Sequence, residues 1–214
     1  MLTRALLLSA GLLLLAGCES AYYSAWEKVG VHKRDILVDR IEDTQEAQED
    51  TQEQFQDALE KYRSVVNFDG GNLEKLYNQL KGEYEDSEAA AAKITARIDS
   101  VEDVAEDLFD EWEEELESYT SDRLRRDSAS KLRDTRAQYQ RLVKTMRRAE
   151  KSVAPVLNTL RDQTLYLKHN LNARAIDSLK GELKTIDADV GRLIYQMQQS
   201  IEQANQFINK IKQG

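Results

Sequence analysis

The two histidines are the first residues to consider for metal chemistry, because imidazole is a common metal ligand. A di-iron centre in a helical bundle needs Glu-x-x-His pairs on facing helices, and neither His32 nor His169 follows a glutamate by three residues. The His-x-x-x-His and Cys-x-x-Cys spacings of zinc sites are also missing, since Cys18 is the single cysteine. We therefore expect no metal centre, and each histidine is predicted to lie at a helix end or in a turn.

Motifs of phosphate and nucleophilic chemistry are missing as well. A phosphate-binding loop has the pattern Gly-x-x-x-x-Gly-Lys-Ser/Thr, but the glycine pair at 70–71 is followed by Asn72, and the Lys-Thr pair at 184–185 follows Leu183. No Gly-x-Ser-x-Gly nucleophile elbow occurs. The dense carboxylates of residues 110–117 are typical of a solvated helix face. The sequence predicts a protein that is not an enzyme and needs no cofactor.

The single cysteine closes an apolar run near the start of the chain. Residues 1–4 carry one arginine and residues 5–16 are apolar; twelve helical residues span about 18 Å, against about 30 Å for a bilayer core, so this run is predicted to be a signal peptide. Leu15-Ala16-Gly17-Cys18 resembles a bacterial lipobox, in which the chain is cut before a lipidated cysteine. We expect residues 1–17 to be removed and Cys18 to anchor 18–214, a single helical domain. Ordinary cleavage beside an incidental cysteine is the alternative.

The residue after the cysteine bears on the destination. Glu19 stands where an aspartate would resemble an inner-membrane retention signal. The sequence therefore favours an outer-membrane lipoprotein that faces the periplasm. The net charge of −9 argues against a protein that lies flat on an anionic lipid surface. The same charge argues against nucleic acid as a partner.

Four long segments have apolar residues at alternating spacings of four and three, which is the heptad pattern of packed helices. The predicted helices are 22–66, 73–118, 122–168 with a bend or short break near Pro155, and 173–212. Near-equal helices with short connections predict an all-α fold, an elongated antiparallel four-helix bundle. Coiled-coil-like hairpins that assemble between chains are the alternative, and heptads leave the oligomeric state open. The predicted apolar seams include Phe55, Tyr62, Ile94, Ile98, Met146, Leu165, Leu179 and Leu193.

Polar positions support this layout. Asn72 and Ser121 are predicted to cap the second and third helices. Residues 99–117 hold eleven acidic and no basic side chains, whereas residues 123–151 hold eleven basic and three acidic ones. If these helices are antiparallel, the two blocks face one another and oppose wrong registers. A surface for an anionic ligand is the alternative function of the basic block.

Two segments carry open alternatives. Thr44, Gln48 and Thr51 interrupt the first seam, which indicates a loosely packed or partner-binding stretch. The aromatic cluster of residues 21–26 suits a membrane–water interface, and it equally suits the first core positions of a helix.

Several blocks of sequence resemble the domain-of-unknown-function 2959 family of bacterial lipoproteins. The blocks are AYYSAWEKVGVHKRDILVDR (21–40), VNFDGG (66–71), YEDSEAA (84–90), VEDVAEDLFDEWEEEL (101–116) and LYLKHNLNARAIDSLKGEL (165–183). The resemblance covers nearly the whole chain after the lipobox. It implies a helical lipoprotein facing the periplasm, and it implies no activity.

Two of these blocks are predicted to meet at the bundle end far from the anchor. The residues expected there form our candidate contact site for a partner: Phe68, Asp69, Gly70, Gly71, His169, Asn170, Asn172 and Arg174. Their alternative role is simply in turns and caps. A second candidate, near the anchored end, consists of Lys33, Arg34, Asp35 and Arg40.

The leading hypothesis for function is a non-enzymatic protein of the cell envelope. It would be a rod tethered at Cys18 that presents its far tip to the cell wall or to an envelope protein. The alternative is a periplasmic binder or holdase-type chaperone for cationic peptides or proteins, which would use the acidic faces and the polar seam.

Overall fold

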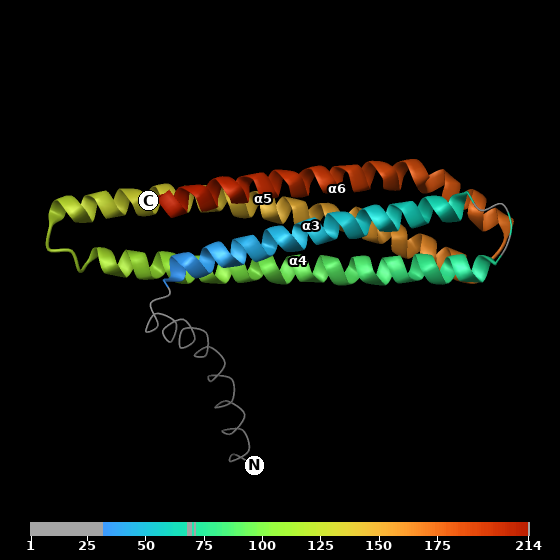
Figure 1. The fold of residues 1–214 in the computed structure, drawn as a ribbon, viewed down its shortest axis with the longest axis horizontal. Helices are drawn as coiled ribbons and strands as arrows, with labels where there is room; N and C mark the ends of the chain where they lie inside the picture. The colour runs from blue at the N-terminus through green and yellow to red at the C-terminus, as the bar shows by residue number, and fades with distance from the viewer. Residues whose placement is uncertain (1–31, 68–69, 71, 214) are drawn as a thin grey trace, which may run out of the picture.

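A computed structural model describes residues 32–67, 70 and 72–213 of the chain. These residues form four long helices, α3 (Lys33–Val66), α4 (Leu73–Leu116), α5 (Asp122–His169) and α6 (Ala173–Gln213), joined by short turns (Figure 1). No strand occurs within the described ranges. The predicted all-α fold is confirmed. The last three helices begin at the predicted residues and end within two residues of the predicted positions.

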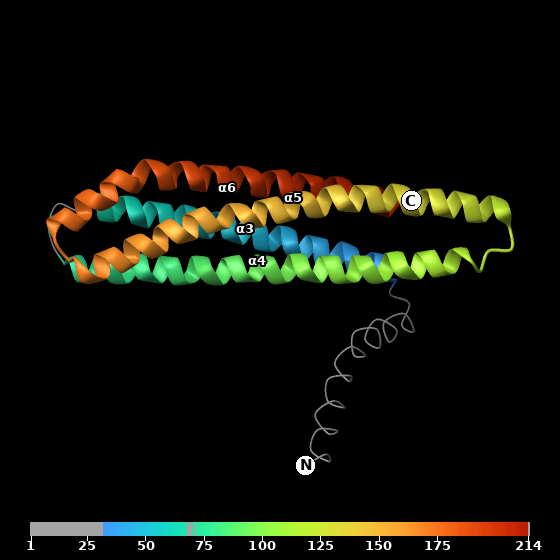
Figure 2. The same cartoon turned by 180° about the vertical axis from the view of Figure 1, so that it is seen from behind.

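The helices form a ring in which each packs mainly against two neighbours. Both α3 and α5 pack against α4 and α6, and consecutive helices run in opposite directions along the rod (Figures 1 and 2). This is the antiparallel four-helix bundle that short connections favour. One chain therefore closes its own core, and hairpin exchange between chains is not needed to bury the seams.

The core follows the heptad seams, because residues four and three apart lie on one face of a helix. Fully burying each such leucine, isoleucine or phenylalanine contributes about 1.5–3 kcal/mol relative to leaving it exposed. The largest fully buried side chains come from all four helices: Leu37, Ile41, Phe55, Tyr62, Leu80, Ile94, Ile98, Leu142, Met146, Leu160, Leu167 and Leu179.

The first helix is shorter than predicted. It begins at Lys33 because His32 has extended backbone angles, φ −82° and ψ 146°, and acts as its N-cap residue. A continuous helix from residue 22 is therefore wrong at His32, and residues 22–31 lie outside the described ranges. The two predicted caps are confirmed: Asn72 Oδ1 accepts from Lys75 N at 3.1 Å and Ser121 Oγ from Leu124 N at 3.4 Å.

Helix α5 continues through Pro155 without a break. The alternative of a break is wrong because the residues on either side of the proline are held in the core: Val153 is 4% exposed and Val156 is fully buried. The proline ring itself is exposed. An interior proline costs about 3 kcal/mol, which two buried valines and the helix beyond them offset.

The polar interruption of the first seam is part of the core. Thr44, Gln48 and Thr51 are all fully buried. The threonine hydroxyls donate to main-chain carbonyls one turn earlier, at 2.8 Å in both cases. Gln48 Nε2 donates to Ser200 Oγ of α6 at 3.1 Å. A partner-binding or loosely packed segment is therefore excluded, since these side chains have bonds inside the bundle and no access to solvent.

Helices α4 and α5 extend past the start of α3 and the end of α6 (Figures 1 and 2). Lys33, the first residue of α3, pairs with Glu111 of α4, and α4 continues to Leu116. We call residues 112–128, which include the α4–α5 turn, the hairpin end. Its two helices are joined by a 2.8 Å hydrogen bond from Trp112 Nε1 to Ser128 Oγ.

Candidate functional site

The predicted contact site lies at one end of the bundle, as expected. The α3–α4 and α5–α6 turns share the end opposite the hairpin end (Figures 1 and 2). We call the described residues at this end of the bundle the turn end; they comprise Gly70, Asn72 and 165–174, of which Gly70, His169, Asn170, Asn172 and Arg174 belong to the predicted site. Phe68, Asp69 and Gly71 of the predicted site lie outside the described residues.

Several members of the predicted site have structural roles. Gly70 has φ +142°, a conformation that residues with a Cβ adopt only with strain. Asn170 Nδ2 donates to Tyr166 O at 3.0 Å, and Asn172 Oδ1 accepts from Arg174 N at 3.0 Å and from Ala175 N at 3.2 Å. The asparagines thus end α5 and begin α6, so the turn-and-cap interpretation holds for these two residues.

His169 and Arg174 are different, because their side chains are exposed and take part in no hydrogen bond or ion pair among the described residues. Beside them lie three large apolar side chains in contact with solvent. Leu165 is 52% exposed, Tyr166 41% and Leu171 42%. The turn end therefore combines a histidine and an arginine with an exposed apolar group, which is the composition typical of a protein contact surface.

Sequence reasoning missed this apolar group and wrongly placed Leu165 in the core. Leu167 is fully buried and Thr164 is nearly so, and these two positions, three apart, take up the inward face of the helix. Leu165 and Tyr166 are then turned outward. The signal was available: residues 165–167 are Leu-Tyr-Leu, and three consecutive apolar residues cannot all face one core from a helix.

The second candidate, near the start of α3, is largely occupied by internal ion pairs. Lys33 Nζ lies 3.1 Å from Glu111 Oε2, and Arg40 Nη1 lies 3.4 Å from Asp43 Oδ2. Arg34 and Asp35 are exposed. Two of the four predicted residues thus stabilise the bundle, which leaves little of this site for a partner.

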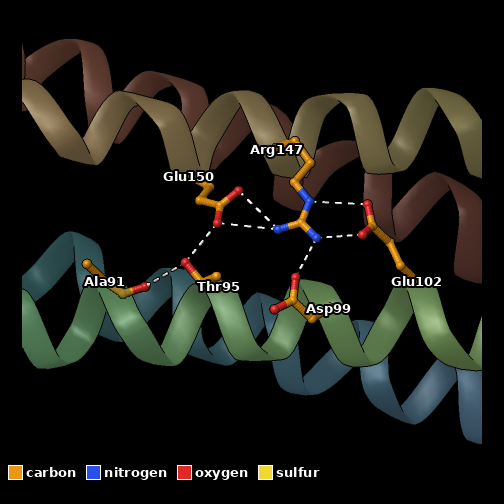
Figure 3. Close-up of polar contacts among 6 residues, drawn as sticks. All are labelled: Ala91, Thr95, Asp99, Glu102, Arg147 and Glu150. Carbon is orange, nitrogen blue, oxygen red and sulfur yellow. Dashed lines mark hydrogen bonds and ion pairs between the residues drawn. The ribbon is translucent and has the colours of Figure 1, made fainter.

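The most connected polar group in the bundle is Arg147 of α5 (Figure 3). Its Nε donates to Glu102 Oε1 at 3.1 Å, its Nη2 to Asp99 Oδ1 at 2.5 Å and its Nη1 to Glu150 Oε2 at 3.1 Å. Thr95 Oγ1 extends the network by a 2.7 Å hydrogen bond to Glu150 Oε1. Arg147 therefore ties the acidic block on α4 to the basic block on α5.

These bonds decide what the Arg147 guanidinium can do. The hydrogen bond to Glu102, followed by those to Asp99 and Glu150, raises the pKa of Arg147 further above its usual value, although partial burial acts in the opposite direction. All three of its nitrogens bond to carboxylates, so at least four of its five N–H donors are used inside the bundle and little of the guanidinium is left for an anionic ligand. Arg136 similarly pairs with Glu113 and lies over the Phe109 ring. The predicted facing of the two charged blocks is confirmed at these positions.

Two open grooves lie along the described helices. One of about 620 Å³ lies between α3 and α6, and its Arg63 and Asp187 form an ion pair with each other. Another of about 420 Å³ lies between α4 and α5 at Tyr139. Burial, followed by the charge of Glu102, raises the pKa of the Tyr139 phenol, which keeps it neutral. Neither groove holds a histidine or a cysteine among its lining residues.

Metal-binding clusters and membrane-spanning helices are both absent from the described residues. No cluster of three or more histidine, cysteine, aspartate or glutamate side chains is arranged to hold a metal ion there. None of the described helices combines the length and apolar character that crossing a membrane requires. His32, at the start of α3, and His169, at the end of α5, occupy helix ends as predicted.

The class that the fold defines is an all-α, antiparallel four-helix bundle, here with exposed apolar side chains at its turn end. Within that class, the chain belongs to the family described as protein of unknown function (DUF2959), whose model matches residues 22–211. The predicted family is thus confirmed. No curated protein and no solved structure matches the chain.

Proposed function

We propose that this protein is a non-enzymatic lipoprotein of the bacterial cell envelope. In this proposal Cys18 carries the lipid, residues 1–17 are removed, and the bundle stands in the periplasm as a rod attached to the outer membrane. The turn end, which lies opposite the start of α3, makes the contact with an envelope protein or with the cell wall.

The observation that carries this proposal is the gathering of exposed apolar side chains at the turn end. Exposure of Leu165, Tyr166 and Leu171 costs burial free energy, at about 25 cal/mol for each Å² of apolar surface. Burial against a partner would recover that free energy. Family membership and the Leu15-Ala16-Gly17-Cys18 pattern support the anchor in the same proposal.

The alternative, a holdase or binder for cationic peptides, has less support. It relied on the polar seam of α3 and on the acidic face of α4. Thr44, Gln48 and Thr51 are fully buried, and carboxylates of the acidic face pair with arginines of α5. These groups are therefore engaged before any peptide arrives.

Photo-crosslinking in cells tests the contact. A photoreactive amino acid replaces Leu171 in one variant and Tyr166 in another, with Tyr195 as the matched control, because it is 57% exposed and lies midway along α6. We expect one defined crosslinked product from the turn-end positions and none from Tyr195. The same products from all three positions, or no product from the turn end, would contradict a specific contact there.

Mass spectrometry of the mature protein tests the anchor separately. We expect a chain that begins at Cys18 and carries a lipid on that residue. Replacement of Cys18 by serine should abolish the modification and release the protein from the membrane fraction. An unmodified Cys18 in a membrane-free protein would overturn the anchor while leaving the contact site to be judged on its own.

A further inference from the structure

The hairpin end has an apolar seam that the described helices do not cover. In the rest of the rod, the seams of α4 and α5 are covered by α3 and α6. Toward the α4–α5 turn, α4 and α5 continue beyond both the start of α3 and the end of α6 (Figures 1 and 2). Two helices alone leave one side of a seam open, because a core-facing helix carries a stripe at least 100° wide.

The side chains along this seam are apolar and accessible. Trp112 and Leu116 lie four residues apart on one face of α4, and both are only half-buried. Leu124 of α5 is 43% exposed and lies one turn before Ser128, which accepts the hydrogen bond from Trp112. Tyr119, in the turn, is 40% exposed. The face is thus apolar in its middle, with acidic side chains on α4 and basic ones on α5 at its rims.

The start of α3 lies directly beside this face. Lys33 pairs with Glu111, and further along Asp50 pairs with Lys93, so each step back along α3 corresponds to a step forward along α4. If that register were continued before Lys33, it would reach Trp112 and then the α4–α5 turn. His32, the N-cap residue of α3, has extended backbone angles. The helical path is therefore interrupted at this residue, which we call the joint.

The segment that precedes this joint has the right length and composition. The family model begins at residue 22, so residues 22–31 belong to the family's shared unit. Ten residues reach about 15 Å as a helix and about 33–36 Å when extended, and the hairpin end extends only five α4 residues past Glu111 before its turn. The segment contains Tyr22, Tyr23, Trp26, Val29 and Val31, with one glutamate and one lysine.

We propose that residues 22–31 dock on the open face of the hairpin end and complete its seam. Continuing the α3–α4 register of these pairs would bring Val29 to the level of residues 114–115 and Trp26 to the level of residues 117–118, next to Leu116 and Tyr119. The near-neutral segment suits a face whose apolar middle lies between acidic and basic rims. This docking is intramolecular and independent of lipidation. If Cys18 is the anchor, the same docking holds the hairpin end next to the membrane.

Trp26 is itself the reporter for the test, because the chain has two tryptophans, Trp26 and Trp112. In the full chain purified in detergent, Trp112→Phe leaves Trp26 as the sole emitter. We expect its emission to be blue-shifted and its quenching by acrylamide to be several-fold weaker than in the urea-unfolded protein. Adding Leu124→Asp should shift the emission to the red and restore most of the quenching.

Leu165→Asp is the matched control, since Leu165 is also an exposed leucine (52%, against 43% for Leu124) but lies at the opposite end of α5, and it should leave Trp26 unaffected. Circular dichroism confirms that each variant is folded. The proposal is overturned if Trp26 is freely quenched in the folded parent, or if Leu124→Asp changes nothing, which would mean that detergent shelters Trp26. Protection that disappears on dilution would assign the face to a second copy of the chain instead.

Hydrogen exchange gives a second measurement with both tryptophans retained. Trp26→Ser should increase exchange several-fold in residues 112–128 of the hairpin end and leave residues 160–175 at the turn end unchanged. Equal exchange in the variant and the parent across 112–128 would contradict docking even if the fluorescence of Trp26 responds.

Discussion

Tyr62 of α3 donates a 2.9 Å hydrogen bond from its phenol to the main-chain carbonyl of Leu179 in α6, and both side chains are fully buried. The bond joins two helices that are 117 residues apart in sequence. A buried hydrogen bond of this kind contributes about 1 kcal/mol net. We expect Tyr62→Phe, which keeps the ring, to lower the free energy of unfolding by about that amount in urea titrations. An unchanged midpoint would show that the hydrogen bond contributes nothing to stability.

The same tyrosine gives the bundle a dependence on alkaline pH. Burial, followed by the negative charge of Glu182, raises the pKa of Tyr62 above its ordinary value. The phenol in the unfolded chain ionises near pH 10, whereas that in the folded chain stays neutral. This contribution to stability is fully present below about pH 10 and is lost as the pH rises toward the folded pKa. Urea midpoints measured across this range should fall less steeply for Tyr62→Phe than for the parent.

Arg147 should contribute more to the free energy of unfolding than Arg148, its neighbour in sequence. Arg147→Met removes the bonds to Asp99, Glu102 and Glu150 and leaves these carboxylates to repel one another, which we expect to lower the free energy of unfolding by about 1–2 kcal/mol. Arg148→Met is the matched control, because Arg148 is exposed and should change stability by less than about 0.5 kcal/mol. Equal losses in both variants would mean that net charge is responsible for the effect, and high salt would then reduce both alike.

The buried polar pair of Gln48 and Ser200 should make the bundle no more stable than a well-packed apolar pair at the same two positions would. Gln48 Nε2 is bonded to Ser200 Oγ, but Gln48 Oε1 has no hydrogen-bond partner among the described residues. Ser200→Ala leaves the amide unpaired and should destabilise by about 1–3 kcal/mol. Gln48→Leu together with Ser200→Ala should recover this loss and equal or exceed the parent, because a well-packed apolar pair is often at least as stable as a buried polar one. Chemical denaturation of the three variants measures the coupling.

Two glycines allow a paired test of the turn end. Gly70→Ala should destabilise by about 1 kcal/mol or more, because φ is +142° there although nothing crowds the added Cβ. Gly181→Ala, inside α6 with equally open space, should stabilise by about 0.5–1 kcal/mol. Thermal unfolding of the two variants should therefore give shifts of opposite sign. Shifts of the same sign would contradict the strained conformation at Gly70.

The helices, their order and the charge complement between α4 and α5 were predictable, because each depends on local spacing and on near neighbours in the sequence. The position of the turn end followed from the count of helices alone. The helix start at Lys33 could not be predicted, since neither glycine nor proline stands at 31–34 and only backbone angles reveal the joint at His32.

The exposed apolar group at the turn end was missed for a different reason. Leu165 was assigned to the core for its apolar character, although spacings of three and four from Leu160 do not reach it, and Thr164 and Leu167 face inward instead. Likewise, the polarity of Gln48 suggested a loosely packed or partner-binding stretch. Its hydrogen-bond partner, Ser200, is 152 residues away in the sequence. Such a partner can be identified only once α3 and α6 lie side by side.

The antiparallel packing of α3 against both of its neighbours has a mechanical consequence. Tension between the start of α3 and the turn end would run along the helix axis and shear all the inter-helix contacts of α3 at once, including those of Lys33, Gln48 and Tyr62. Tension between the start of α3 and the end of α6, which meet at the Lys212–Glu42 ion pair, would instead peel the two helices apart one contact at a time. The rod should therefore resist pulling along its length far better than pulling at its two chain ends.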